Sequence, residues 1–406
     1  MTALRHIHLR SWPAVTPPRF PSYALATAVQ TELQQHLLRW KAERADASRD
    51  TSPPPPTLLT FTPAPTYTLG RRQTEPLSAA ELARLQRPLR LRYLGRRDRS
   101  RGAQQAEEDW ALAPTVTRAP RGGLATYHGP GQVVFWPVVD LRSPLHERAL
   151  SVRDYACLLE RTSIAALASL PASPGPSPSS PGSGGIRGFT TSNPGVWVRG
   201  SSVRPSFSSP APALSLSGAV GEKGGEGEEV GEEHKIAALG VHLRRHVTGL
   251  GVAINVGMPT SRGDNSSDDD ELTNPWARID ACGLGDKGVT SVAAELGLQI
   301  DDSAGATSAG GGNKVTHDIG LSLYDALTTA WSREFAARLG LDGVASGEAG
   351  LSLEGGREQD RRREWGPALG LSSLETVEDG YVTAERWTSS GGDGGLGGNG
   401  AEAVLT

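Results

Sequence analysis

A polar, glycine-dense loop that runs directly into an apolar strand constrains this chain most. Residues Arg121 to Gln132 read Arg-Gly-Gly-Leu-Ala-Thr-Tyr-His-Gly-Pro-Gly-Gln, and the next residues, Val133 to Asp140, are almost all apolar. Such a run predicts a buried strand, and the glycines before it let backbone N–H groups and a ligand approach closely. Arg121, Tyr127 and His128 add a positive charge and two hydrogen-bonding groups that a structural turn does not need. We therefore expect this loop to form the wall of a binding site.

Composition indicates that the folded part is smaller than the length of 406 residues suggests. The chain contains 50 glycines and 29 prolines, and most of them lie in a few segments with little apolar periodicity. Segments of this kind do not bury enough apolar surface to fold. We expect one folded domain over residues 1–341, with disordered insertions at 171–192 and 201–233, and a low-complexity, disordered tail at 342–406.

Charge and hydropathy exclude several classes of protein. The net charge of −4 gives no electrostatic reason to expect a nucleic-acid or membrane partner. The sequence has no apolar run of about 18 residues and no secretory signal pattern, so we expect a soluble intracellular protein. Two cysteines, Cys157 and Cys282, are too few for a zinc site or a disulfide framework. We expect both to be free thiols, and we expect no metal.

The N-terminal segment fits two interpretations. The first 31 residues contain Arg5, Arg10 and Arg19 but no acidic residue, which is typical of a mitochondrial presequence. Residues Leu4 to Leu9 instead alternate like a first core strand, which would leave almost no length for a cleavable leader.

Apolar spacing along the chain predicts a mixture of helices and strands. Helical spacing occurs from Val289 to Leu296, behind Asp286 as an N-cap, and also at residues 23–44, 151–170 and 324–339. Strand-like runs occur at residues 58–61, 66–70, 133–140 and 195–198. Residues 236–246 and 251–256 predict a hairpin with its turn at Thr248 and Gly249. The mixed order favours an α+β fold with an antiparallel or mixed sheet and flanking helices, rather than a βαβ repeat.

Two residues have local surroundings that suit nucleophilic chemistry. Cys282 lies in a glycine-rich stretch shortly before an expected helix, where backbone N–H groups and the helix dipole favour a thiolate. Lys235 follows the acidic insertion and opens an apolar strand, where a partly desolvated cation can exchange protons near neutrality. The structural alternatives are a small buried cysteine and an ordinary solvated lysine. A lysine beside Cys282 would favour the thiolate and return a proton to a leaving group, so pairing would make both residues catalytic.

Three other polar features each leave two interpretations open. His128 fits a general base or a structural hydrogen-bonding group in a tight loop. Cys157 lies within an amphipathic helix, where a small buried side chain is favoured over chemistry. The basic run from His242 to His246, which includes Arg244 and Arg245, fits a solvated strand face or a docking patch for an acidic carrier protein.

Four motifs in order resemble the signature of the lipoyl(octanoyl) transferases. They lie at residues 121–132, 235–240, 251–255 and 281–291. Similarity at residues 4–9, 66–72 and 151–155 extends the resemblance over most of the chain up to about Leu298. The long insertions resemble the fungal type of the family, which implies a mitochondrial location. The alternative expectation is a cytoplasmic location. Thr62 and Pro63 depart from the pattern, because family members often have an acidic residue and a histidine there.

The resemblance implies the fold of the biotin and lipoate protein ligases, which is class II synthetase-like. It implies an acyltransferase that moves an octanoyl group from acyl carrier protein to a lysine of a lipoyl domain, with no cofactor, as the first step of lipoate synthesis. The acceptors would be lipoyl domains of 2-oxoacid dehydrogenases and the H protein of glycine cleavage. Cys282 would carry the acyl group as a thioester, and Lys235 would tune the thiol. The expected substrate pocket comprises Arg121, Gly122, Gly123, Leu124, Ala125, Thr126, Tyr127, His128, Ala238, Leu239, Gly240, Gly251, Val252 and Ala253.

The chemistry of this transfer agrees with the residues present. Thiolate attack on a thioester exchanges one thioester for another at similar free energy, and amine attack then forms a more stable amide, so no ATP is required. The sequence contains no phosphate-binding loop of the Walker type. Three alternatives remain: an ATP-dependent lipoate–protein ligase, a non-catalytic carrier-protein binding module that uses Arg244 and Arg245, and a hydrolytic cysteine enzyme.

Overall fold

The computed structural model describes residues in two units of the chain, Met1–Gly347 and Glu348–Thr406. The described residues are 3–9, 11, 19–45, 53–91, 110–145, 149–170, 185–199, 232–259, 270–280, 287–298, 317–345, 373–374 and 387–388. In the second unit, β14 (Ser373–Leu374) and β15 (Trp387–Thr388) pair antiparallel with each other. All other elements below belong to the first unit.

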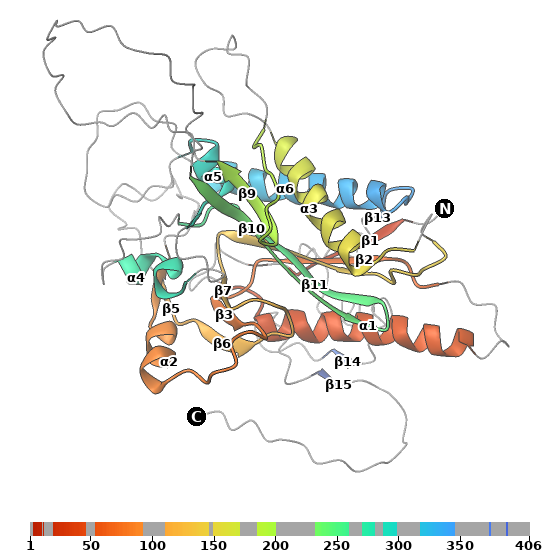
Figure 1. The fold of residues 1–406 in the computed structure, drawn as a ribbon, viewed down its shortest axis with the longest axis horizontal. Helices are drawn as coiled ribbons and strands as arrows, with labels where there is room; N and C mark the ends of the chain where they lie inside the picture. Colours follow the sequence, from red (N-terminus) through yellow and green to blue (C-terminus); the bar gives the residue numbers. More distant parts are fainter. Residues whose placement is uncertain are drawn as a thin grey trace, which may run out of the picture. The chain divides into compact units, whose positions relative to one another are not determined.

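A mixed sheet of eight strands forms the centre of the first unit (Figure 1). Parallel pairs join β1 to β2, β1 to β13 and β10 to β12, and the remaining pairs are antiparallel. The predicted α+β class with a mixed sheet is therefore confirmed. The strand order is β12 (Gly288–Val289), β10 (Glu233–Arg244), β11 (Val247–Asn255), β8 (Gln132–Val138), β2 (Thr57–Phe61), β1 (Leu4–Leu9) and β13 (Val344–Ala345), and β9 (Gly195–Arg199) also pairs with β10.

Long helices cover both faces of this sheet. They are α1 (Tyr23–Ala45), α3 (Val152–Ala168) and α6 (His317–Arg338). Successive side chains of β8 point to opposite faces, so Phe135 stacks on Trp331 of α6 while Trp136 meets Tyr23 of α1, with ring centroids 4.5 and 5.2 Å apart. Figure 1 shows α3 and α6 side by side, with α1 on the opposite side of the sheet. Within the described ranges, none of the helices is long and apolar enough to cross a membrane.

The hairpin of β10 and β11 turns at Arg245 and His246, so the predicted turn at Thr248 and Gly249 is wrong. Both turn residues have positive φ, 49° and 69°, as a two-residue turn of the I′ type requires. Thr248 and Gly249 instead lie within β11. The glycine serves a different purpose, because a Cβ there would lie 2.3 Å from Nε2 of Gln34 on α1.

Reciprocal capping boxes begin two of the helices. Ser151 Oγ accepts from the N–H of Asp154 at 3.1 Å, and the Asp154 carboxylate accepts from the N–H of Ser151 at 3.0 Å, so α3 begins where the sequence predicts. Helix α2 (Ala79–Gln86) is absent from the sequence prediction, although Ser78 and Glu81 form the same reciprocal pair. This Ser-x-x-Glu pattern is the signal that identifies the helix.

A strand takes the place of the first turn of the helix expected behind Asp286. Val289 lies in β12 as the parallel neighbour of Lys235, and its backbone is therefore engaged by the sheet. Helix α5 (Val292–Glu295) begins only after Ser291, which caps it. Asp286, the expected N-cap, lies outside the described residues.

Parts of the segments expected to be disordered are packed. Ile186 is 6% exposed in the main core, and Phe189 exchanges two backbone hydrogen bonds with Trp197 of β9, at 2.8 and 2.9 Å. The tail expected from residue 342 contributes β13, which pairs with β1. Residues 171–184 and 201–231 lie outside the described part of the chain.

A second, smaller sheet carries the glycine-dense loop. Its central strand β3 (Thr66–Leu69) pairs with β6 (Thr115–Arg118) in parallel and with β7 (Ala125–His128) antiparallel. Residues 119–124 join β6 to β7, and residues 129–131 join β7 to β8. The single loop predicted at residues 121–132 is therefore wrong for residues 125–128, which form strand β7. A further pair consists of β4 (Leu89–Leu91) and β5 (Trp110–Leu112).

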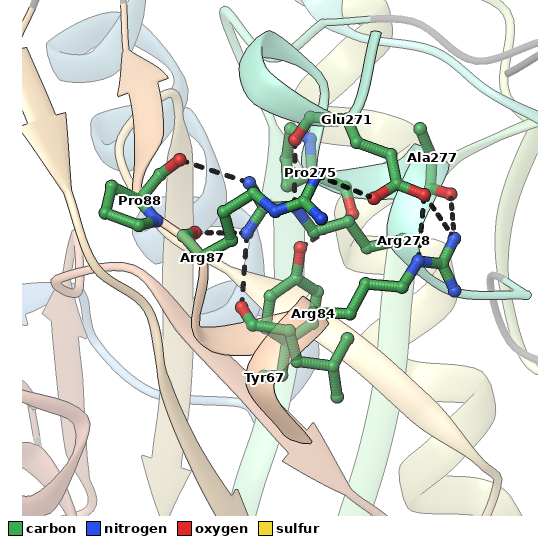
Figure 2. A network of polar contacts seen from close by, with 9 residues as sticks. Tyr67, Arg84, Arg87, Pro88, Glu271, Pro275, Ala277 and Arg278 are labelled. Atoms are coloured by element: carbon green, nitrogen blue, oxygen red, sulfur yellow. Dashed lines mark hydrogen bonds and ion pairs between the residues drawn. The ribbon is translucent and has the colours of Figure 1, made fainter. Parts of the chain in front are cut away.

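A buried arginine holds the chain that precedes Cys282. Arg278 is 2% exposed and ends the 3₁₀ helix η1 (Pro275–Arg278), which follows α4 (Asp270–Thr273). The carboxylate of Glu271 accepts from Nε and Nη2 of Arg84 at 2.8 and 2.6 Å. This network fastens α4 and η1 to the α2–β4 region (Figure 2). The Arg278 guanidinium donates to the carbonyl oxygens of Glu271, Leu85, Arg87 and Pro88.

We predict that Arg278→Ala lowers the free energy of unfolding by about 3 kcal/mol, because it leaves buried carbonyl groups without their charged donor. Denaturant titration followed by circular dichroism measures this change. Arg153→Ala, on the exposed start of α3, is the matched control and should stay within about 0.5 kcal/mol of the wild type. A loss below about 1 kcal/mol for Arg278→Ala would contradict a stabilising role.

Candidate active site

A cavity of about 280 Å³ opens between the glycine-dense loop and the β10–β11 hairpin. Most of the expected pocket residues line it, and so does Lys235. The lining residues are Tyr23, Arg72, Arg121, Gly122, Gly123, Leu124, Thr126, His128, Trp136, Asn193, Pro194, Lys235, Ala238, Leu239, Gly240, Val241, Leu250, Gly251, Val252 and Ala253.

Two expected pocket residues, Ala125 and Tyr127, do not line this cavity. They alternate along β7 with Thr126 and His128, so their side chains leave the strand on the other face. Tyr127 is fully buried and lies 5.9 Å from the ring of Trp276. Burial raises the pKa of its hydroxyl well above the usual value. Tyr127 therefore packs the smaller core on the far side of the strand.

The guanidinium of Arg121 holds the loop in shape. Its Nη1 donates to the carbonyl oxygens of Gly122 and Leu124 at 2.9 Å, and its Nη2 donates to the backbone and hydroxyl oxygens of Thr68 at 2.7 Å. The aliphatic stem lies against Gly240, where a Cβ would be 2.7 Å from Cδ of Arg121. The charge expected to face a ligand is thus directed into the protein backbone.

His128 is buried, neutral and fixed in orientation. Burial, together with the nearby charge of Arg121, lowers the pKa of the imidazole to about 4. The ring stacks on Tyr23 at 5.6 Å, and Nδ1 lies 2.8 Å from Oε1 of Gln132. Because Nε2 of Gln132 donates to Oδ1 of Asn255 at 2.9 Å, its Oε1 must accept, and Nδ1 of His128 carries the proton. The lone pair of the imidazole is then on Nε2.

The same chain of hydrogen bonds reaches the strand that carries Lys235. Gln132 and Asn255 are direct neighbours across β8 and β11. Nδ2 of Asn255 donates to the carbonyl oxygen of Thr290 at 3.0 Å, and the N–H of Thr290 donates to the carbonyl oxygen of Lys235 at 3.0 Å. His128 and Lys235, which both line the cavity, are therefore joined through one buried polar path.

Lys235 is a buried cation held over an aromatic ring. Lys235 lies near the start of β10 and is 8% exposed. Nζ lies 4.9 Å from the ring of Trp197, its neighbour on β9, and Nζ of Lys287 lies 5.0 Å from the same ring. Lys287 pairs with Glu233 at 2.5 Å, whereas Lys235 has no carboxylate partner among the described residues. The solvated alternative for Lys235 does not fit this burial.

A bulge and a glycine make room for this lysine. The register of β9 against β10 shifts between Lys235 and Ala237, which is a β-bulge. Gly195, which pairs with Ala238 beside the bulge, has a φ of 123°. A Cβ at Gly195 would lie 2.4 Å from the carbonyl oxygen of Ala237 and 3.0 Å from Cε of Lys235. The positive φ and the contact with the backbone of β10 therefore require glycine at residue 195, and a side chain there would also crowd the lysine stem.

The expected nucleophile, Cys282, lies outside the described residues. The described chain stops two residues before it at Asp280 and resumes at Lys287. Arg278 fixes the chain on the first side, and Val289 pairs with Lys235 on the second. The other cysteine, Cys157, is a half-buried free thiol on α3.

Sequence reasoning misses the residues that support His128 and Lys235. Gln132, Asn255 and Trp197 are 0%, 3% and 0% exposed. A signal exists for the first two, because each is a polar side chain in a strand whose other residues are nearly all apolar or glycine. Trp197 has no such signal, because a tryptophan in an apolar strand predicts only core packing.

Comparison with known proteins finds a matching family model and similar proteins. The family model for the lipoyl protein ligase A/B catalytic domain matches residues 23–307. A probable octanoyltransferase of Schizosaccharomyces pombe is 30% identical over 58% of this chain and 69% of that protein. A mitochondrial octanoyl-[acyl-carrier-protein]:protein N-octanoyltransferase of Danio rerio is 30% identical over 68% of this chain and 79% of that protein.

A solved lipoate protein ligase of Thermoplasma acidophilum is 12% identical and aligns over 84% of this chain and 85% of that chain, with a TM-score of 0.36. The range matched by the family model contains every residue that lines the cavity, and it also contains Cys282. The chain therefore belongs to the lipoyl protein ligase A/B catalytic domain family and, within it, to the octanoyltransferases, which are acyltransferases.

Proposed function

We propose that this protein transfers an octanoyl group from acyl carrier protein to a lysine of a lipoyl domain, through a thioester on Cys282. The observation that carries the proposal is the ammonium of Lys235, buried in the cavity wall with no carboxylate partner among the described residues. A buried cation in this state is stabilised by an anion that arrives or forms beside it. A cysteine thiolate and the oxyanion of a thioester adduct are two such anions.

The cavity suits a hydrocarbon chain beside a reacting carbonyl. Its wall includes Leu239, Val241, Leu250, Val252 and Trp136, which present apolar surface. Burial of the six methylenes of an octanoyl chain contributes about 5 kcal/mol, at about 0.8 kcal/mol for each group. The lining thus supplies binding energy to the acyl chain, whereas Lys235 acts at its polar end.

The first half-reaction moves the acyl group to the enzyme. The Cys282 thiolate attacks the thioester carbonyl, the bond to the donor sulfur breaks, and the leaving thiolate takes a proton from the ammonium of Lys235. In the second half-reaction, the amine of the lipoyl-domain lysine attacks the acyl-enzyme, and neutral Lys235 accepts the proton that this amine loses. The products are an amide, a free donor thiol and the original ion pair, so protons balance without ATP.

His128 acts as a hydrogen-bonding group rather than as the general base. An imidazole with a pKa of about 4 is a weak base near neutral pH, so it removes protons inefficiently. Gln132 fixes its tautomer, and Nε2 remains as an acceptor at the cavity. This arrangement suits a group that orients a substrate N–H.

The proposed reaction belongs to lipoate synthesis, and we propose where in the cell it occurs. Octanoyl transfer to a protein lysine is the first step of lipoate synthesis, and the lipoyl domains of 2-oxoacid dehydrogenases and the glycine-cleavage H protein are the acceptors. The name of the Danio rerio relative includes a mitochondrial location, and the first 31 residues of this chain contain arginines but no acidic residue. On these two grounds we propose a mitochondrial location. Leu4 is fully buried and β1 pairs with β2 and β13, so cleavage beyond residue 9 would remove a core strand.

We predict that Cys282→Ala abolishes transfer and that Lys235→Met lowers kcat by at least about 100-fold, the usual contribution of a proton-transfer group. Intact-mass analysis after incubation with octanoyl carrier protein should show one octanoyl adduct on the wild type and none on Cys282→Ala. Cys157→Ala is the control, because it removes the second thiol of the chain but keeps Cys282, and it should retain the adduct. Acylation of Cys282→Ala, or a requirement for ATP, would favour a different mechanism such as that of a lipoate ligase.

We predict that His128 makes the folded state sensitive to acid. In the unfolded chain His128 takes up a proton near pH 6.5, whereas in the folded protein it stays neutral until about pH 4. The contribution of neutral His128 to the free energy of unfolding is therefore complete above pH 6.5 and is lost as the pH falls towards 4. Between pH 7 and pH 5 the loss is about 2 kcal/mol. Denaturant titrations at both pH values measure it. His128→Gln should lack this part of the loss, and His6, whose pKa burial also lowers to about 4, is common to both proteins.

A further inference from the structure

Two consecutive arginines, one of which lines the cavity, have no role in the transfer chemistry described above. Arg71 and Arg72 follow β3, and both side chains are exposed. Arg72 lines the cavity that also contains Lys235. The reaction of a thioester beside Lys235 and Cys282 does not require a second cation where the cavity opens to solvent. The charges of Arg71 and Arg72 therefore have another purpose.

The turn that carries the two arginines is firmly held. The N–H groups of Arg71 and Arg72 donate to the carbonyl oxygens of Arg121 and Gly123 at 2.8 and 3.2 Å. Gly70 permits this approach, because a Cβ there would lie 2.3 Å from the oxygen of Gly123. The backbone is thus fixed against the cavity wall, and little ordering of the main chain is needed when a ligand arrives.

The charges of this turn are not neutralised within the described part of the chain. Neither Arg71 nor Arg72 forms an ion pair with a described residue, and Glu75, the acidic residue nearest in sequence, pairs with neither. Burial lowers the pKa of His242 on β10, and the nearby charge of Arg71 lowers it further. Positive charge therefore gathers where the cavity meets solvent.

We propose that Arg71 and Arg72 form a phosphate-binding site that holds the phosphodiester of the pantetheine arm on the acyl donor. The proposal rests on the transfer function above, since the arm must pass the mouth for its thioester to reach Lys235. A guanidinium binds phosphate oxygens through paired N–H groups, and two guanidinium groups on a fixed turn match a phosphate better than a single mobile cation. Acidic side chains of the carrier protein are the competing ligands of the same pair.

Donors that differ only in the arm test this assignment. The wild type and the double variant Arg71→Gln/Arg72→Gln are assayed with octanoyl-pantetheine, which lacks phosphate, with octanoyl-phosphopantetheine, and with octanoyl carrier protein. We expect the KM of both phosphate-bearing donors, relative to that of octanoyl-pantetheine, to rise at least about 10-fold in the double variant. Arg72→Lys, which keeps the charge but loses the paired donors, should give an intermediate ratio. Arg153→Gln on α3, over the opposite face of the sheet, should leave all ratios unchanged.

The remaining outcomes overturn the inference. An unchanged ratio rules out an anion site at this turn, and a ratio that rises only for the carrier protein assigns the arginines to its acidic side chains instead. Calorimetric titration with phosphopantetheine and pantetheine, neither of them acylated, separates this result from a failure of the transfer function. A preference for the phosphate-bearing compound that the double variant loses supports the site even if no acyl transfer is found, and no preference in the wild type refutes it.

Discussion

A path of hydrogen bonds through an otherwise apolar sheet ties together two residues that line the cavity. It runs from His128 through Gln132 and Asn255 to Thr290, and from the backbone of Thr290 to that of Lys235. Each member is a buried polar group, so the loss of one partner would leave another unsatisfied in a medium of low dielectric constant. The path therefore fixes strand register, histidine tautomer and the position of β12 at once.

Positive charge is used in three distinct ways around this cavity. Arg121 directs its guanidinium into backbone carbonyl groups and so shapes the loop. Lys235 is buried over Trp197 without a described carboxylate, which leaves its charge for the reacting group. Arg71 and Arg72 remain exposed at the mouth. The difference lies in what surrounds each cation, because residue type alone does not distinguish them.

The sequence predicts the helices and strands that have strong periodicity and the motifs that have unusual composition. Prediction fails where contacts between elements distant in sequence determine the local structure. Helix α3 begins at the predicted residues, whereas the hairpin turns at Arg245 and His246, where no glycine marks the turn. Gly249 is misleading because its small size serves the contact with Gln34. Most of the expected pocket residues do line one cavity, yet Trp197 and the bulge beside Lys235 depend on strand pairing that no local pattern encodes.

The pairing of β1 with β13 brings the beginning and the end of the first unit to the same margin of the sheet. A shortened chain intended for crystallisation should therefore keep residues up to Ala345. Cutting at Leu341 would strip the outermost strand and leave the backbone of β1 open to pairing with another molecule, which favours aggregation. A bulky affinity tag joined directly to Leu4 would disturb the same edge of the sheet, because the side chain of Leu4 is fully buried.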